Sequence, residues 1–70
     1  MLPSLRYWRR QRGFTQEQLA ERLGMHRNTL WRIESGGPTF KRTARLLAIA
    51  LRVQVTVLIE PPPELLNGAQ

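Results

Sequence analysis

The chain has 70 residues, with 11 Lys and Arg against five acidic residues, which gives a formal net charge of +6. It contains no Cys, which excludes disulfides and thiolate zinc sites, and no apolar run reaches the ~20 residues that a membrane span requires. A domain of this size buries only ~60% of the surface of its unfolded chain, so we expect a second subunit to add stability.

A first helix is predicted over residues 4–11, where Leu5 and Trp8 fall one turn apart on one face. Arg9 lies on the same side as Leu5, and a charge in that position requires a partner. Gly13 is the predicted end of this helix, because glycine readily adopts the left-handed conformation of a C-terminal cap.

A second helix is predicted to begin at Thr15, because Thr15 and Gln18 have the spacing of a capping box. Gly24 then permits a tight corner, and a third helix follows from about Arg27. Two short helices joined by such a turn are typical of a helix-turn-helix. The positions predicted to face the core are Leu19, Ala20, Leu23, Leu30 and Ile33.

A fourth helix is predicted over residues 39–51, after the break "SGGP" at residues 35–38. Its inward stripe consists of Phe40, Ala44, Leu47, Ala48 and Leu51. The segment "LLAIAL", residues 46–51, is apolar nearly all round and therefore needs cover on two sides. This pattern indicates a contact with a second subunit.

A β-strand is predicted over residues 53–60, because β-branched residues alternate there with a period of two. The chain offers no second strand, so we expect pairing with the same strand of another copy across a dimer. The strand residues of that dimer would be Val53, Val55, Val57 and Ile59. A short fifth helix over "VTVLIE", residues 55–60, is the alternative. With the strand, residues 1–60 would form one domain that includes the dimerisation strand, and residues 61–70 would form a flexible tail.

The outer face of the third helix carries long polar side chains at Arg27, Asn28, Trp31 and Arg32. A helix fits the major groove of DNA, where Arg binds guanine edges and Asn binds adenine edges. On an ordinary solvated face, Glu and Lys would serve as well, so base reading is the preferred interpretation. For the arginines between Arg6 and Arg12, a solvated helix face and phosphate contact both stay open.

The stretch "RGFTQEQLAERLGMHRNTLWRIESG" resembles the Xre/Cro–repressor type of helix-turn-helix family, and "TARLLAIAL" resembles the next helix of that family. The resemblance implies a mostly α, four-helix, lambda-repressor-like DNA-binding domain, here with a C-terminal β-strand that pairs across a dimer. It implies base reading by Arg27, Asn28 and Arg32. It also implies that Gln16 holds a phosphate, with DNA backbone or flanking contacts from His26, Thr29 and Trp31.

Arg9 and Glu34 are predicted to form a partly buried ion pair between the first and third helices. The reason is the charge on the apolar side of the first helix, together with a Glu at the end of the third. Breaking such a pair strands a buried charge, so the pair would be structural.

The predicted function is a sequence-specific transcriptional repressor that binds a palindromic double-stranded DNA operator as a homodimer. The resemblance implies a bacterial or phage protein of the cytoplasm and nucleoid. No enzyme, metal or cofactor is expected, since one His and no Cys leave no nucleophile–base pair. A likeness of residues 51–63 to the end of HipB-type antitoxins implies an alternative, an antitoxin that binds a protein toxin and regulates its own operon. Nonspecific binding of DNA or RNA through the arginines is a further alternative.

Overall fold

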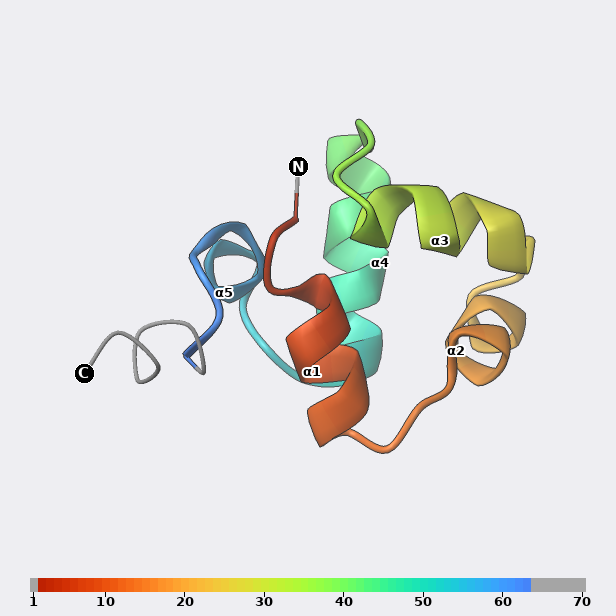
Figure 1. Ribbon diagram of the computed structural model, residues 1–70, viewed down its shortest axis with the longest axis horizontal. Helices are drawn as coiled ribbons and strands as arrows, with labels where there is room; N and C mark the ends of the chain where they lie inside the picture. The colour runs from red at the N-terminus through yellow and green to blue at the C-terminus, as the bar shows by residue number, and fades with distance from the viewer. Residues whose placement is uncertain (1, 64–70) are drawn as a thin grey trace.

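The computed structural model describes residues 2–63, and every regular element in that range is a helix. The helices are α1 (Leu5–Gln11), α2 (Gln16–Arg22), α3 (Arg27–Glu34), α4 (Lys41–Leu51) and α5 (Val55–Ile59). Helix α4 runs through the middle of the molecule, with α2 and α3 on one side and α5 on the other (Figure 1). No helix among the described residues has both the length and the apolar character needed to cross a membrane.

The predicted capping box at the start of α2 is confirmed. The Thr15 side chain accepts a hydrogen bond from the Gln18 backbone N–H at 3.0 Å, and the Gln18 side chain accepts from the Thr15 N–H at 2.9 Å. Gly24 has φ +68° and forms the corner to α3, a conformation that costs glycine little. The two helices on either side of this corner form the helix-turn-helix.

The core gathers leucines from every helix. Leu5, Leu19, Leu30, Leu47, Leu51 and Leu58 are completely buried. Full burial of each such side chain stabilises the fold by ~1.5–3 kcal/mol relative to exposure. Because these residues come from all five helices, the core fixes α2 and α3 relative to α1 and α4.

The predicted C-terminal strand is wrong, because Val55–Ile59 form helix α5. Val55 and Leu58 are three residues apart and both pack on the core, which places them on one face of a helix. In a strand these two positions would face opposite sides. Packing of Leu58 therefore outweighs the β propensity of the branched residues. The proposed ribbon of Val53, Val55, Val57 and Ile59 across a dimer does not form in this structure.

The N-terminal segment forms hydrogen bonds with backbone carbonyl groups at the C-terminal end of α5. The Ser4 N–H donates to the Leu58 carbonyl at 3.1 Å, and the Ser4 hydroxyl donates to the Glu60 carbonyl. Ser4 itself is fully buried, so these bonds satisfy polar groups that water cannot reach. Of the predicted tail over 61–70, Pro62 is buried, and residues 64–70 lie outside the described residues.

Two expectations for α4 need correction or refinement. Phe40, predicted to face inward, is 77% exposed and precedes the helix as its N-cap. Within "LLAIAL", Leu47 and Leu51 are fully buried, whereas Leu46 and Ile49 are 46% and 72% exposed. One side of the segment is therefore covered by its own chain, and the other is not.

Candidate nucleic-acid interface

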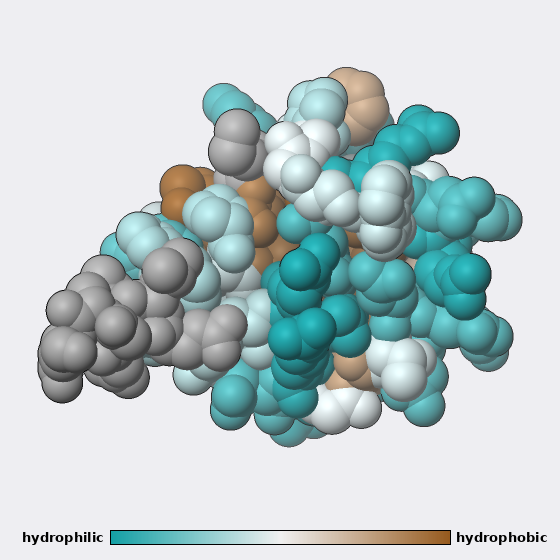
Figure 2. Space-filling model, in the orientation of Figure 1, coloured by the Kyte–Doolittle hydropathy of each residue, from teal (hydrophilic) through white to brown (hydrophobic). Residues whose placement is uncertain are grey.

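Helix α3 separates its side chains into an inner and an outer face. Leu30 and Ile33 are buried, and the outer positions Arg27, Asn28, Trp31 and Arg32 are exposed as predicted. Trp31 retains 55% of its accessible surface. The outer face therefore presents hydrogen-bond donors of the types that read base edges in a major groove. Hydrophilic side chains gather over α1, α2 and α3 in the view of Figure 2.

His26 caps α3 with its side chain. The residue has an extended backbone, and its Nδ1 accepts a hydrogen bond from the Asn28 N–H at 3.0 Å. The bond satisfies one of the N–H groups that a helix leaves open at its start. His26 and Thr29 are both exposed beside the outer face of α3, which leaves them accessible to a ligand of that face.

A buried carboxylate lies behind this face. Glu34, at the end of α3, has a side chain with 0% exposure, and the Arg9 side chain is 9% exposed. The structure brings the two together, since Arg9 Nε lies 2.6 Å from Glu34 Oε2 and Arg9 Nη2 lies 3.3 Å from Oε1. Arg9 Nη1 also donates to the Phe14 carbonyl at 2.8 Å. Arg9 therefore links α1 to α3 and to the loop before α2.

Two further donors reach the same carboxylate. Gln16 Nε2 donates to Glu34 Oε1 at 3.1 Å, and Arg6 Nε lies 3.4 Å from that oxygen. Glu34 thus joins the first residue of α2 to α1 and α3. The second N–H of the Gln16 amide is not used in this contact, so Gln16 can still donate to an anion. The sequence did not reveal this role of Glu34 in orienting Gln16 and Arg6.

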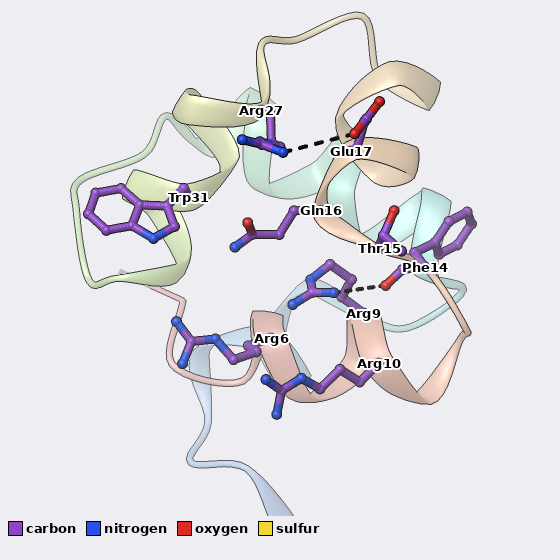
Figure 3. A pocket seen from close by; sticks show the side chains of 9 residues that line it. All are labelled: Arg6, Arg9, Arg10, Phe14, Thr15, Gln16, Glu17, Arg27 and Trp31. Atoms are coloured by element: carbon purple, nitrogen blue, oxygen red, sulfur yellow. Dashed lines mark hydrogen bonds and ion pairs between the residues drawn. The ribbon is translucent and has the colours of Figure 1, made fainter.

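A cleft of about 610 Å³ opens above this network, between α1, the start of α2, and α3 (Figure 3). Four arginines and a single carboxylate line it, which gives the lining a formal charge of 4 − 1 = +3. The lining residues are Arg6, Arg9, Arg10, Phe14, Thr15, Gln16, Glu17, Arg27 and Trp31. A basic cleft of this kind concentrates anions.

The carboxylate of the cleft is paired. Glu17 Oε2 lies 3.9 Å from Arg27 Nη1, and both side chains are largely exposed, at 75% and 61%. Contacts of this kind contribute little to stability in water. The sequence did not predict this contact, because Glu17 comes near Arg27 only where the turn at Gly24 brings α2 and α3 together.

A second cavity, of about 640 Å³, lies at the other side of Trp31 and is mainly apolar. It is lined by the C-terminal part of α3, the following loop, and the exposed Phe40. Thr29 and Arg32 also contribute to its wall. Trp31 therefore separates a basic cleft from an apolar groove. The sequence did not predict this groove, because Phe40 was placed in the core.

The described residues contain no group of three or more His, Cys, Asp or Glu side chains arranged to hold a metal ion. What the surface offers instead is a row of exposed donors on one helix beside a positively charged cleft. These features suit a nucleic acid, which carries many phosphate charges and exposes base edges that hydrogen-bond donors can recognise.

Comparison with known families gives a match to the family described as helix-turn-helix over residues 5–58. The matched range includes α1 to α4 completely, α5 up to Leu58, and every residue that lines the cleft and the groove. Comparisons with curated proteins and with solved structures gave no match. The family is one of DNA-binding transcription regulators. The chain belongs to the Xre/Cro type of helix-turn-helix proteins.

Proposed function

We propose that this DNA-binding regulator is a repressor that reads a specific double-stranded DNA operator with the outer face of α3. The observation that carries the proposal is the division of α3 into a buried apolar face and an exposed face with Arg27, Asn28 and Arg32. In the major groove, Arg pairs with guanine O6 and N7, and Asn pairs with adenine N6 and N7. The protein would act in the cytoplasm, on DNA of the nucleoid.

A contact between Gln16 and the DNA backbone would fix the position of α3 relative to the bases. Gln16 is held by Glu34 beside the cleft, and its remaining amide N–H is directed to a DNA phosphate in this proposal. Phosphate contacts set the register of a protein on the duplex but carry no sequence information. His26, Thr29 and Trp31 would flank the base readers on the backbone or on thymine methyl groups.

We further propose that the protein acts as a homodimer on a palindromic operator. One helix-turn-helix reads a half-site, so two recognition helices ~34 Å apart would read a complete site. With the strand replaced by α5, the apolar contact would come from the exposed side chains of α4 and α5: Leu46, Ile49 and Ile59. Such side chains gain free energy when a second copy removes them from water.

The dimer is tested by sedimentation of the wild type and of Ile49→Glu at micromolar concentration. The wild type should sediment as a dimer and the variant as a monomer, with unchanged helical circular dichroism. Lys41→Glu, which changes the exposed first residue of the same helix two turns away from Ile49, is the control and should leave the dimer intact. A monomeric wild type would contradict the dimer.

The experiment that tests specificity is selection of binding sites from random DNA duplexes. The proposal predicts a recovered sequence with two inverted half-sites about one helical turn apart. Nonspecific binding of DNA or RNA predicts no enriched sequence and an affinity controlled by salt alone. Recovery of unrelated sequences would therefore overturn the proposal in favour of that alternative.

The antitoxin alternative has lost its supporting feature. It depended on a C-terminal strand followed by a proline stop, and residues 55–59 are helical. Among the residues that the structure describes, no other feature favours a toxin partner over DNA alone. We therefore propose the repressor as the single function.

A further inference from the structure

Helix α1 contributes two arginines to the wall of the basic cleft. Arg6 and Arg10 are four residues apart, a spacing that places both on one face of a helix. Both line the cleft, and both extend from α1 to the same side of it in Figure 3. Arg27 and Trp31 of α3 line the cleft as well, so a ligand of α3 would meet α1 too.

Arg9, the third arginine that α1 contributes to the cleft, is already hydrogen-bonded within the protein. All three nitrogens of the Arg9 guanidinium donate to Glu34 or to the Phe14 carbonyl. Arg6, by contrast, uses only Nε, at 3.4 Å from Glu34, and its side chain is 47% exposed. Its Nη1 and Nη2 groups make no hydrogen bond within residues 2–63. Contact with Glu34 thus orients the Arg6 guanidinium and leaves its outer edge for a ligand.

Arg10 has no anionic partner among the described residues and is exposed to solvent. The neighbouring carboxylates do not neutralise it, because Glu34 is buried against Arg9 and Glu17 lies beside Arg27. The outer edge of the Arg6 guanidinium and the whole Arg10 guanidinium are bound to no carboxylate among the described residues, and together they suit an oxygen-rich anion. Guanidinium groups bind phosphate oxygens through paired N–H bonds.

We propose that Arg6 and Arg10 bind phosphates of the DNA backbone that lie beyond the bases read by α3. The inference rests on the proposed function, since it takes the ligand of the cleft to be the same duplex. A DNA strand whose bases meet α3 would carry its adjoining phosphates past Gln16 to the α1 wall. Recognition would then involve three helices, of which only α3 reads sequence.

The test compares Arg10→Gln and Arg6→Gln with Arg45→Gln, an equal loss of charge on α4, away from both cavities beside α3. Dissociation constants are measured at 50 and 200 mM salt, on the selected operator and on a scrambled duplex of equal length. Each lost phosphate contact removes about 0.9 from the salt slope, and a homodimer loses one contact in each of its two subunits. The deficit of each α1 variant should therefore be about 12-fold larger at 50 mM than at 200 mM. The deficit should be the same on both duplexes.

A salt dependence of Arg10→Gln or Arg6→Gln equal to that of Arg45→Gln would overturn the inference. Thermal unfolding of Arg6→Gln shows whether the loss of its contact with Glu34 has changed the fold, and Arg10→Gln carries no such complication. The outcome is separate from that of the proposed function. If the wild type still prefers the operator, only the α1 contact fails; if the wild type shows no preference, base reading fails whatever the salt slopes are.

Discussion

The cluster around Glu34 and the outer face of α3 use the same residue type for opposite purposes. In the cluster, Arg9 is 9% exposed, and each of its three guanidinium nitrogens donates to a protein oxygen. On α3, Arg27 is 61% exposed, and its nearest carboxylate oxygen is 3.9 Å away. A protein with ten arginines therefore does not use them as one basic surface. The partner of each arginine, and not its charge, decides whether it holds the fold or stays exposed at the surface.

The two regions are also physically connected. Glu34 is the last residue of α3, and its carboxylate holds Gln16 and Arg6 at the edge of the basic cleft. Loss of the Arg9–Glu34 pair should affect stability first, whereas substitution of the base readers on the outer face should affect only DNA binding. The following substitutions test that separation, beginning with the largest expected effect.

Arg9→Met should lower the free energy of unfolding by ~3–5 kcal/mol, because it strands the buried carboxylate of Glu34. Thermal or denaturant unfolding measures the loss. The double variant Arg9→Met with Glu34→Leu removes both charges and should recover much of the stability. An unchanged melting temperature for Arg9→Met would show that the pair is not structural.

Gln16→Ala should weaken binding to operator and scrambled duplexes alike, by ~1.5–3 kcal/mol per subunit, because each subunit loses a hydrogen bond to a charged phosphate. The ratio of the two dissociation constants should stay constant. Gln11→Ala, an exposed Gln at the end of α1, is the matched control and should bind as the wild type does. A loss confined to the operator would instead make Gln16 a base reader.

His26→Ala should destabilise the fold by ~1 kcal/mol, because it removes the side-chain acceptor at the start of α3. His26→Ser restores a capping oxygen and should recover that stability. Chemical denaturation of the three proteins provides the comparison. Equal stability of the Ala and Ser variants would show that the hydrogen bond to Asn28 adds nothing.

Glu17→Gln should change stability by less than about 1 kcal/mol, since its contact with Arg27 is exposed. DNA binding should become tighter on all duplexes, because a carboxylate that repels phosphates leaves the cleft. Titrations at low salt should show the gain, and higher salt should reduce it. Weaker binding by Glu17→Gln would mean that Glu17 is needed to orient Arg27.

The sequence was sufficient for the helix-turn-helix, because its signals are local. The Thr15–Gln18 cap, the corner at Gly24 and the inward Leu30 and Ile33 all lie within one continuous stretch. The partner of Arg9 was also predictable, because a charge on an apolar face requires a counter-charge. The choice of α5 over a strand was not, since it depends on Ser4 and Leu58, which are far apart in sequence.

The arrangement of the basic cleft also depends on residues that are far apart in the sequence, so it was not predictable from local patterns. Arg6 and Arg10 were recognisable as an i, i+4 pair, but their position opposite α3 depends on how α1 packs. The positions of Phe40 and of the apolar groove likewise depend on the direction in which the chain enters α4. Local patterns specify the elements, whereas packing of distant residues specifies which surfaces they share.

The central claim is that the exposed face of α3 reads bases, and a comparison of Arg32→Ala with the wild type tests it most directly. Both proteins are titrated with the selected operator and with a set of duplexes that each change one base pair. We expect a loss of ~1–3 kcal/mol per half-site on the operator and a preference abolished at one base position of each half-site, with Arg27→Ala and Asn28→Ala each acting at other positions. An equal loss on every duplex, scrambled DNA included, would contradict base reading by α3.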